Sequence, residues 1–184
     1  MEQSDSKPKQ TGRTRDTLFR ITYQHQSQLI QIADYKANMN ISLCAMIISA
    51  IIAVIGYGAV SGRIDNYSSL LIIPIAIIIL TCLLSLIFAI QSARPKILTT
   101  AHNVKSSLLF FGEIAEHSQP DYIRKMKDLL ESDTEMYEHM ILDIHNQGII
   151  LKRKYNLLRK SYQILMYGFT LTVIIFIAVI LMGI

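Results

Sequence analysis

Three long uncharged stretches dominate the pattern of hydrophobic and polar positions along the chain. They cover residues 37–62, 68–93 and 161–184. Each is longer than the roughly 18 residues that distinguish a transmembrane helix from a buried helix of a soluble core, and about 20 residues suffice to cross a bilayer. The pattern therefore predicts three transmembrane helices, over residues 39–60, 70–91 and 162–184.

The segment before the first of these stretches divides into two parts. Residues 1–15 contain little that can be buried and predict a disordered basic tail. Residues 16–38 predict a cytoplasmic helix that leads into the first transmembrane helix. Several apolar side chains fall at helical spacing in this segment and could share one face of it: Leu18, Ile21, Leu29, Ile32 and Tyr35.

Residues 94–160 predict a helical cytoplasmic domain. We expect helices over 99–117 and 122–130, and then one long helix from Thr134 to Ile184 that includes the last transmembrane segment, with Gly148 as its weakest point. The predicted fold is an all-α membrane protein with three transmembrane helices. Its cytoplasmic bundle consists of inward extensions of the first and third transmembrane helices together with the inserted helices.

Charge is distributed in a way that predicts the orientation in the membrane. Lys and Arg are frequent before the first and third transmembrane segments, whereas the loop between the first two contains one Arg and one Asp. By the positive-inside rule, the amino terminus and residues 94–160 face the cytoplasm and the carboxyl terminus faces outward. The net charge of +4 does not predict a nucleic-acid partner, because residues 94–160 hold eleven basic and nine acidic side chains.

The sequence offers little for catalysis. It has no HExxH, Walker, GxSxG or CxxC motif, so we expect neither an enzyme nor a protein with a bound cofactor. His139 and Asp143 stand one helical turn apart, as two metal ligands would, but no second pair accompanies them. Cys44 and Cys82 both lie in transmembrane segments and indicate helix packing rather than a disulfide.

A set of polar and aromatic residues near the predicted membrane surface is suited to ligand recognition. Cations would bind a phosphate, an aromatic ring would stack on a base, and amides would bind its edge. From the chemistry of the residues alone a structural role is favoured, in which they cap helices, connect the bundle or extend toward the membrane surface. The candidate site consists of Asp34, Lys36, Asn38, Arg94, Lys96, Phe111, Asn146, Gln147 and Lys154.

Several motifs, in their order along the chain, resemble the PycTM family of Pycsar transmembrane effectors. They are the Ala33–Asn38 string before the first transmembrane segment, Ala93-Arg-Pro95 after the second, Leu108–Glu113, Asp143–Gln147 and Lys154-Tyr155. The resemblance extends from about Thr17 to Ile184. It implies a bacterial inner-membrane effector of anti-phage defence, activated by cyclic UMP or cyclic CMP from a pyrimidine cyclase. It also implies damage to the membrane and abortive infection.

A three-helix subunit is too small to enclose a wide pore, so we expect a homo-oligomer in the lipid bilayer. Three alternatives remain open from the residues alone. A membrane-anchored adaptor or scaffold would bind no small molecule, a membrane-bound enzyme would depend on His139 or Asp143, and a constitutive pore would leak without a ligand.

Overall fold

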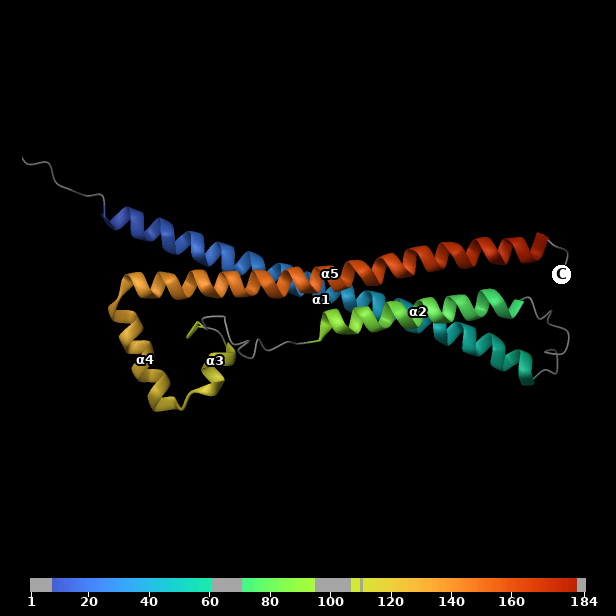
Figure 1. Cartoon of the computed structure of the whole chain (residues 1–184), viewed down its shortest axis with the longest axis horizontal. Coiled ribbons are helices and arrows are strands. Elements are labelled where there is room, and N and C mark those ends of the chain that lie inside the picture. The colour runs from blue at the N-terminus through green and yellow to red at the C-terminus, as the bar shows by residue number, and fades with distance from the viewer. Residues whose placement is uncertain (1–7, 61–70, 95–106, 110, 182–184) are drawn as a thin grey trace, which may run out of the picture. The chain divides into compact units, whose positions relative to one another are not determined.

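The computed structural model describes residues 8–60, 71–94, 107–109 and 111–181, without the side chains of residues 8–11 and 111–113. These residues form helices and no strand. Figure 1 shows the helices in chain order: α1 (Pro8–Val60), α2 (Ile72–Ala93), α3 (Phe111–Glu116), α4 (Gln119–Glu131) and α5 (Asp133–Leu181). The predicted all-helical fold is confirmed for this part of the chain.

The chain divides into two compact units. Unit 1 comprises residues 1–31 and 95–152, and unit 2 comprises residues 32–94 and 153–184. Unit 1 thus contains the first part of α1, all of α3 and α4, and the first part of α5. Unit 2 contains α2 and the remainder of α1 and α5.

Three helices of the described residues are long and apolar enough to cross a membrane. They are α1, α2 and α5, as the uncharged stretches predict. The prediction of one unbroken helix through Gly148 is also confirmed, because α5 is continuous from Asp133 to Leu181. A single glycine costs a helix only about 1 kcal/mol relative to alanine, which a helix of this length can absorb.

Unit 2 has small and polar side chains inside and large apolar side chains outside. Its fully buried residues include Ala33, Ala37, Cys82, Ala89 and Ser92. Large apolar side chains are exposed on all three helices, for example Met46, Leu80 and Ile174. Helices that pack in lipid have this distribution, because small residues allow close approach and the lipid tails solvate the apolar exterior.

A buried polar network joins the three helices of unit 2. The Asn40 side-chain amide on α1 donates to the Oγ atoms of Ser85 on α2 (3.1 Å) and Ser161 on α5 (2.6 Å). Each serine hydroxyl also lies within hydrogen-bonding distance of the other serine's carbonyl oxygen, at 2.6 and 3.0 Å. These three side chains are at most 2% exposed, so their polar atoms obtain from one another the hydrogen bonds that lipid cannot supply.

Close helix contacts extend along unit 2 beyond this network. Cys44 on α1 and Cys82 on α2 are buried and pack with Ile78 in a small cluster. On α5, Gly168 faces Thr81 so closely that a Cβ atom at Gly168 would lie 2.8 Å from the Thr81 Cβ. The absence of a side chain at Gly168 is therefore what permits the approach of α5 to α2.

In unit 1 the first parts of α1 and α5 pack side by side and run in the same direction. The Tyr137 hydroxyl donates to the Asp16 carboxylate at 2.8 Å, and its ring stacks on Phe19 with centroids 5.6 Å apart. Further along both helices, the Gln26 side-chain nitrogen would lie 4.0 Å from a Cβ atom at Gly148. The register of the two helices in unit 1 therefore sets Asp16 near Tyr137 and Gln26 near Gly148.

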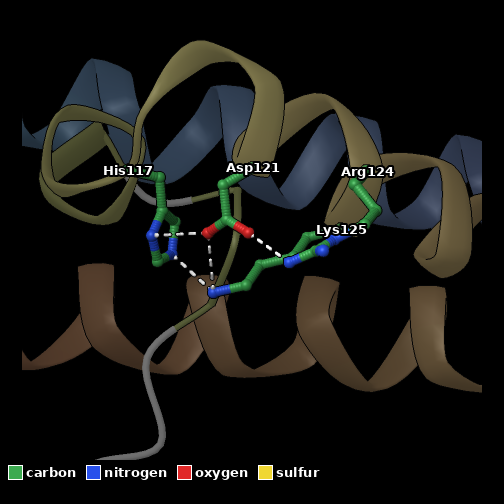
Figure 2. Close-up of polar contacts among 4 residues, drawn as sticks. All are labelled: His117, Asp121, Arg124 and Lys125. Carbon is green, nitrogen blue, oxygen red and sulfur yellow. Dashed lines mark hydrogen bonds and ion pairs between the residues drawn. The ribbon is translucent and has the colours of Figure 1, made fainter.

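Helix α4 of unit 1 begins with a cluster of charged side chains, shown in Figure 2. Asp121, in the first turn, pairs with Arg124 at 2.5 Å and Lys125 at 3.4 Å, and His117 lies 3.6 Å from it. Desolvation raises the pKa of the Asp121 carboxyl, but Lys125 and Arg124 outweigh this effect and hold the pKa below its usual value. A carboxylate in the first turn is also stabilised by the positive end of the helix dipole.

Two parts of the sequence-based prediction are wrong. Residues 8–15 are helical and not a disordered tail, because α1 begins at Pro8, a residue favoured in the first turn of a helix. Residues 107–109 form a turn and not part of a helix over 99–117. There the Ser107 hydroxyl accepts a hydrogen bond from the Leu109 N–H at 3.2 Å, a local bond that competes with helix formation.

Of the five apolar residues predicted to share one face of α1, Leu29 is half-buried. The others, Leu18, Ile21, Ile32 and Tyr35, are exposed. The helix predicted over residues 122–130 is confirmed, because α4 covers it and extends by a few residues. Of the remaining predicted segments, residues 1–7, 61–70, 95–106 and 182–184 lie outside the described residues.

Candidate ligand site

Unit 1 contains a cavity of about 510 Å³ between the first parts of α1 and α5. The turn at residues 107–109 contributes to its wall. The lining residues are Asp16, Phe19, Arg20, Tyr23 and Gln24 from α1, Leu109 from the turn, and Met140, Asp143 and Ile144 from α5. Cavities of 300 to 1,000 Å³, or roughly that range, accommodate small organic ligands.

The α1 wall combines two aromatic rings with a cation. Phe19 and Tyr23 lie four residues apart and hence on one side of the helix, and Arg20 stands beside Phe19. Arg20 is exposed and forms no ion pair within the described residues. This wall therefore presents a surface for stacking a planar ring and a free guanidinium for an anion.

The opposite wall, on α5, contains a buried acid. Asp143 is 4% exposed, and burial raises the pKa of its carboxyl above the usual value. Because no cation pairs with it among the residues that the structure describes, its ionised form gains nothing to offset desolvation. Perturbed carboxyls in cavities are frequent at binding sites, so Asp143 strengthens the assignment of this cavity as a site.

His139 holds the turn in place against α5. Its Nδ1 accepts a hydrogen bond from the Leu108 N–H at 3.3 Å, and its carbonyl oxygen accepts one from the Ser107 hydroxyl at 3.1 Å. These contacts position Leu109 in the cavity wall. His139 and Asp143, considered above as a metal pair, thus have different surroundings, and the described residues contain no group of three or more His, Cys, Asp or Glu side chains placed to hold a metal.

Three amide oxygens lie one helical turn beyond the cavity. The buried side-chain atoms without a hydrogen-bond partner in the described part of the chain are Gln26 Oε1, Asn146 Oδ1 and Gln147 Oε1. Asn146 and Gln147 follow Asp143 by three and four residues, and Gln26 follows Tyr23 by three. A buried acceptor without a partner costs about 1–3 kcal/mol, so an unpaired set of this kind is unusual in a purely structural contact.

The predicted site residues fall into both units. Asp34 and Lys154 belong to unit 2 and form an ion pair between α1 and α5. Lys36 is exposed, and its carbonyl oxygen accepts a hydrogen bond from the Tyr162 hydroxyl at 3.1 Å. Asn38 and Arg94 are exposed, the latter at the end of α2. In unit 2 the structure therefore brings together Asp34 and Lys154.

Asn146 and Gln147 belong to unit 1, next to the cavity residues of α5. Lys96 lies outside the described residues, and the side chain of Phe111, at the start of α3, is not described. Sequence reasoning missed Phe19, Arg20 and Tyr23. The sequence does show two aromatic residues one helical turn apart beside an arginine. The predicted site, however, was confined to residues near the membrane surface, and these three precede that region.

Residues 17–182 match the PycTM family, described as the Pycsar effector protein domain. The chain belongs to the PycTM family. This match confirms the resemblance inferred from the motifs, and it includes every residue that lines the cavity except Asp16. Neither a comparison with curated proteins nor one with solved structures found a match.

PycTM membership and the three apolar helices together fit a membrane effector of Pycsar defence. They also fit an inner-membrane protein in contact with the lipid bilayer. PycTM is a family of membrane effectors and not of known enzymes. The cavity in unit 1 lies inside this family domain, on the parts of α1 and α5 that precede their apolar segments.

Proposed function

We propose that this protein is the membrane effector of a Pycsar anti-phage system, activated by cyclic UMP or cyclic CMP. Activation impairs the integrity of the bacterial inner membrane and leads to abortive infection. Membership in the PycTM family is the observation that carries the proposal. The cavity in unit 1 supports it, because its lining offers the three groups that a nucleotide needs: aromatic rings, an exposed guanidinium and hydrogen-bonding side chains.

The ligand binds in this cavity with its base against Phe19 and Tyr23. The cyclic phosphate carries one negative charge and pairs with Arg20, whose guanidinium matches two phosphate oxygens at once. The predicted phosphate partners Lys36 and Arg94 remain a second hypothesis for the same role. Both are exposed.

Activation requires that the ligand bind one arrangement of the helices more tightly than another, since equal affinity shifts no equilibrium. The cavity lies between α1 and α5, and both helices also contribute an apolar segment to unit 2. A change in their contact is therefore a direct route from ligand to membrane. The activated protein assembles into a homo-oligomer.

The orientation follows from the charge distribution. The amino terminus and residues 94–160 face the cytoplasm, where the cyclase releases its product, and the carboxyl terminus faces outward. This orientation places the cavity residues of α1 and α5 on the cytoplasmic side. The cytoplasmic residues form the helical bundle that receives the ligand.

The test is the thermal stability of the detergent-purified protein against a panel of cyclic mononucleotides and dinucleotides. A ligand at about a hundredfold its Kd adds roughly 2.7 kcal/mol to the free energy of unfolding. We expect an increase in Tm with cyclic UMP or cyclic CMP that Arg20→Ala abolishes and Lys127→Ala, an exposed change on α4, preserves.

Two outcomes would change the proposal. If Arg20→Ala binds nucleotide normally and Lys36→Ala or Arg94→Ala does not, the phosphate lies in the site first predicted from the sequence. If no cyclic mononucleotide raises the Tm, the protein is not a sensor of this kind, and the membrane-anchored adaptor becomes the better description.

A further inference from the structure

Helix α1 has a second face besides the one that packs inside its own chain. The inner face recurs every seven residues, and its members lie against α5 or are buried: Phe19, Gln26, Ala33 and Asn40. The second face, here called the outer seam, has alternating spacings of three and four residues, and all of its members are exposed: Leu18, Ile21, His25, Gln28, Ile32, Tyr35, Met39, Ser42 and Met46. A sustained repeat of this period is typical of a helix that pairs with another helix along its length.

The first part of the outer seam exposes large apolar side chains to water. In unit 1, Leu18 is 63% exposed and Ile21 is 56% exposed. Both residues precede the uncharged stretch that begins at residue 37 by several helical turns, so lipid does not cover them. Ile32 is exposed on the same face. Apolar surface of this kind, when it faces water, marks a site of interaction with another molecule.

Two grooves lie on the outer seam. One has a volume of about 620 Å³ and includes Leu18 and Ile21, and the other has a volume of about 360 Å³ and includes Tyr35, Met39 and Met46. All the residues that line either groove belong to α1, so no other described element of the chain fills them. In paired helices, side chains of one helix occupy such spaces between the side chains of the other.

A second copy of this chain is the occupant that fits both grooves. A soluble protein reaches only the first groove and lipid covers only the second, which lies at the start of the uncharged stretch. An occupant of both is therefore a helix that enters the membrane beside α1 in the same direction. Between Ile21 and Ala33, α1 contains no Asp, Glu, Lys or Arg, so two parallel copies in one register bring no like charges together there.

The length of the outer seam is sufficient for a specific contact. From Leu18 to Met46 it extends about 42 Å at 1.5 Å per residue, on a helix about 12 Å wide. This strip amounts to roughly 500 Å² on each subunit, and the pair thus reaches the total of about 1,000 Å² that a specific interface requires.

We propose that the outer seam joins α1 to the α1 helix of a second copy, as a parallel pair that forms without nucleotide. The same residues face each other across a two-fold axis, so each surface is its own complement. His25 and Gln28 are the polar members in the water-exposed part of the seam, and each meets its own counterpart. Polar residues at such positions fix the register, because any shift would place them against apolar side chains. This contact goes beyond the proposed function, which concerns the nucleotide and the activated assembly.

Disulfide formation between subunits tests the pairing in membrane vesicles that contain the full-length protein without nucleotide. Gln28→Cys, at an exposed position of the seam, should give a covalent dimer on oxidation, as seen on a non-reducing gel, because facing residues of a parallel pair lie within the Cα separation of about 6 Å that a disulfide needs. The matched control is Gln31→Cys, an exposed glutamine of α1 to one side of the seam, which should give severalfold less dimer. Wild type gives the background, since Cys44 and Cys82 are buried.

A second substitution tests the apolar contact itself. Ile21→Glu, combined with Gln28→Cys, should lower the yield of the covalent dimer severalfold, because it places two carboxylates against each other in the seam. Ile123→Glu, the same change at an exposed isoleucine of α4 in unit 1, is the control and should leave the yield unchanged. Both isoleucines are exposed, so neither change disturbs the interior of unit 1.

Several results would overturn the pairing. They are equal yields from Gln28→Cys and Gln31→Cys, a product whose mass is not that of two copies, a dimer that Ile21→Glu leaves intact, and a dimer that forms only after nucleotide is added. The thermal response to nucleotides is independent of these results. A dimer without any such response leaves the outer seam intact and contradicts the proposed function, whereas a monomer that responds to nucleotide overturns the pairing alone.

Discussion

Asp143 shows how a single buried side chain links stability to pH. Burial raises its folded-state pKa above the unfolded-state value, so between the two values the unfolded chain binds fewer protons than the folded one. The contribution of this residue to the free energy of unfolding is therefore fully present at pH below the unfolded pKa. It declines as pH rises through the interval and stays lost above the folded pKa.

We expect Asp143→Asn to remove this pH dependence and to stabilise the ligand-free protein at neutral pH, because asparagine has no charge to desolvate there. Unfolding by heat in detergent, at a series of pH values from acid to neutral, measures the effect. Asp128→Asn, an exposed change on α4, is the control and should leave the curve unchanged. Parallel pH profiles for wild type and Asp143→Asn would contradict this account.

Gly168 sets the distance between α5 and α2 in unit 2. Its substitution by alanine would place a methyl group in contact with Thr81 that neither backbone can accommodate without moving. We expect Gly168→Ala to lower the free energy of unfolding by about 1–3 kcal/mol, the usual cost of overpacking. Gly56→Ala provides the comparison, because a Cβ atom there would meet nothing within 4 Å. Equal stability of the two variants would show that α5 and α2 can move apart at this contact at little cost in free energy.

At the scale of helices, the polar network of unit 2 leads to a prediction about stability that does not involve a ligand. Asn40→Ala removes two hydrogen bonds between helices, and we expect a loss of about 1–2 kcal/mol, since such bonds in membrane proteins average about 0.6 kcal/mol and the lost side chain adds a cavity. Asn38→Ala, two residues earlier and exposed, should be neutral. Unfolding in detergent distinguishes them, and a neutral Asn40→Ala would mean that the serines alone hold the contact.

The positions of the helices were predictable because length and lack of charge determine a transmembrane segment without reference to its neighbours. The face that α1 buries was not predictable from the sequence. Ranking by hydrophobicity favours Leu18, Ile21, Ile32 and Tyr35, whereas packing in unit 2 buries Ala33, Ala37 and Asn40. Close contact between helices depends on small size and hydrogen bonding, and hydrophobicity measures neither.

The candidate site was predictable in part for a related reason. Asn146 and Gln147 are noticeable in sequence as polar residues on an apolar stripe, and the structure places them beside the cavity residues of α5. Phe19, Arg20 and Tyr23 have no such contrast with their neighbours. Their common position on a cavity wall arises from the pairing of α1 with α5, which are more than 100 residues apart in the chain.

For the whole molecule, the decisive question is whether damage to the membrane depends on the nucleotide. We expect cells that express this protein with an active pyrimidine cyclase to lose their membrane potential, as followed with a voltage-sensitive dye. Cells with a catalytically inactive cyclase, or with the Arg20→Ala effector and an active cyclase, should keep it. Depolarisation without the cyclase would indicate a constitutive pore, and its absence throughout would favour an adaptor.

The two thiols of unit 2 offer a way to follow that process in the unmodified chain. Cys44 and Cys82 lie on different helices, within one buried cluster, and they are the only cysteines of the sequence. A mild oxidant such as copper phenanthroline should therefore join α1 to α2 within one subunit and leave no other bond to confuse the assay. If activation separates these helices, the yield of the cross-link should fall when nucleotide is added. The wild-type protein thus contains its own proximity probe for the resting state.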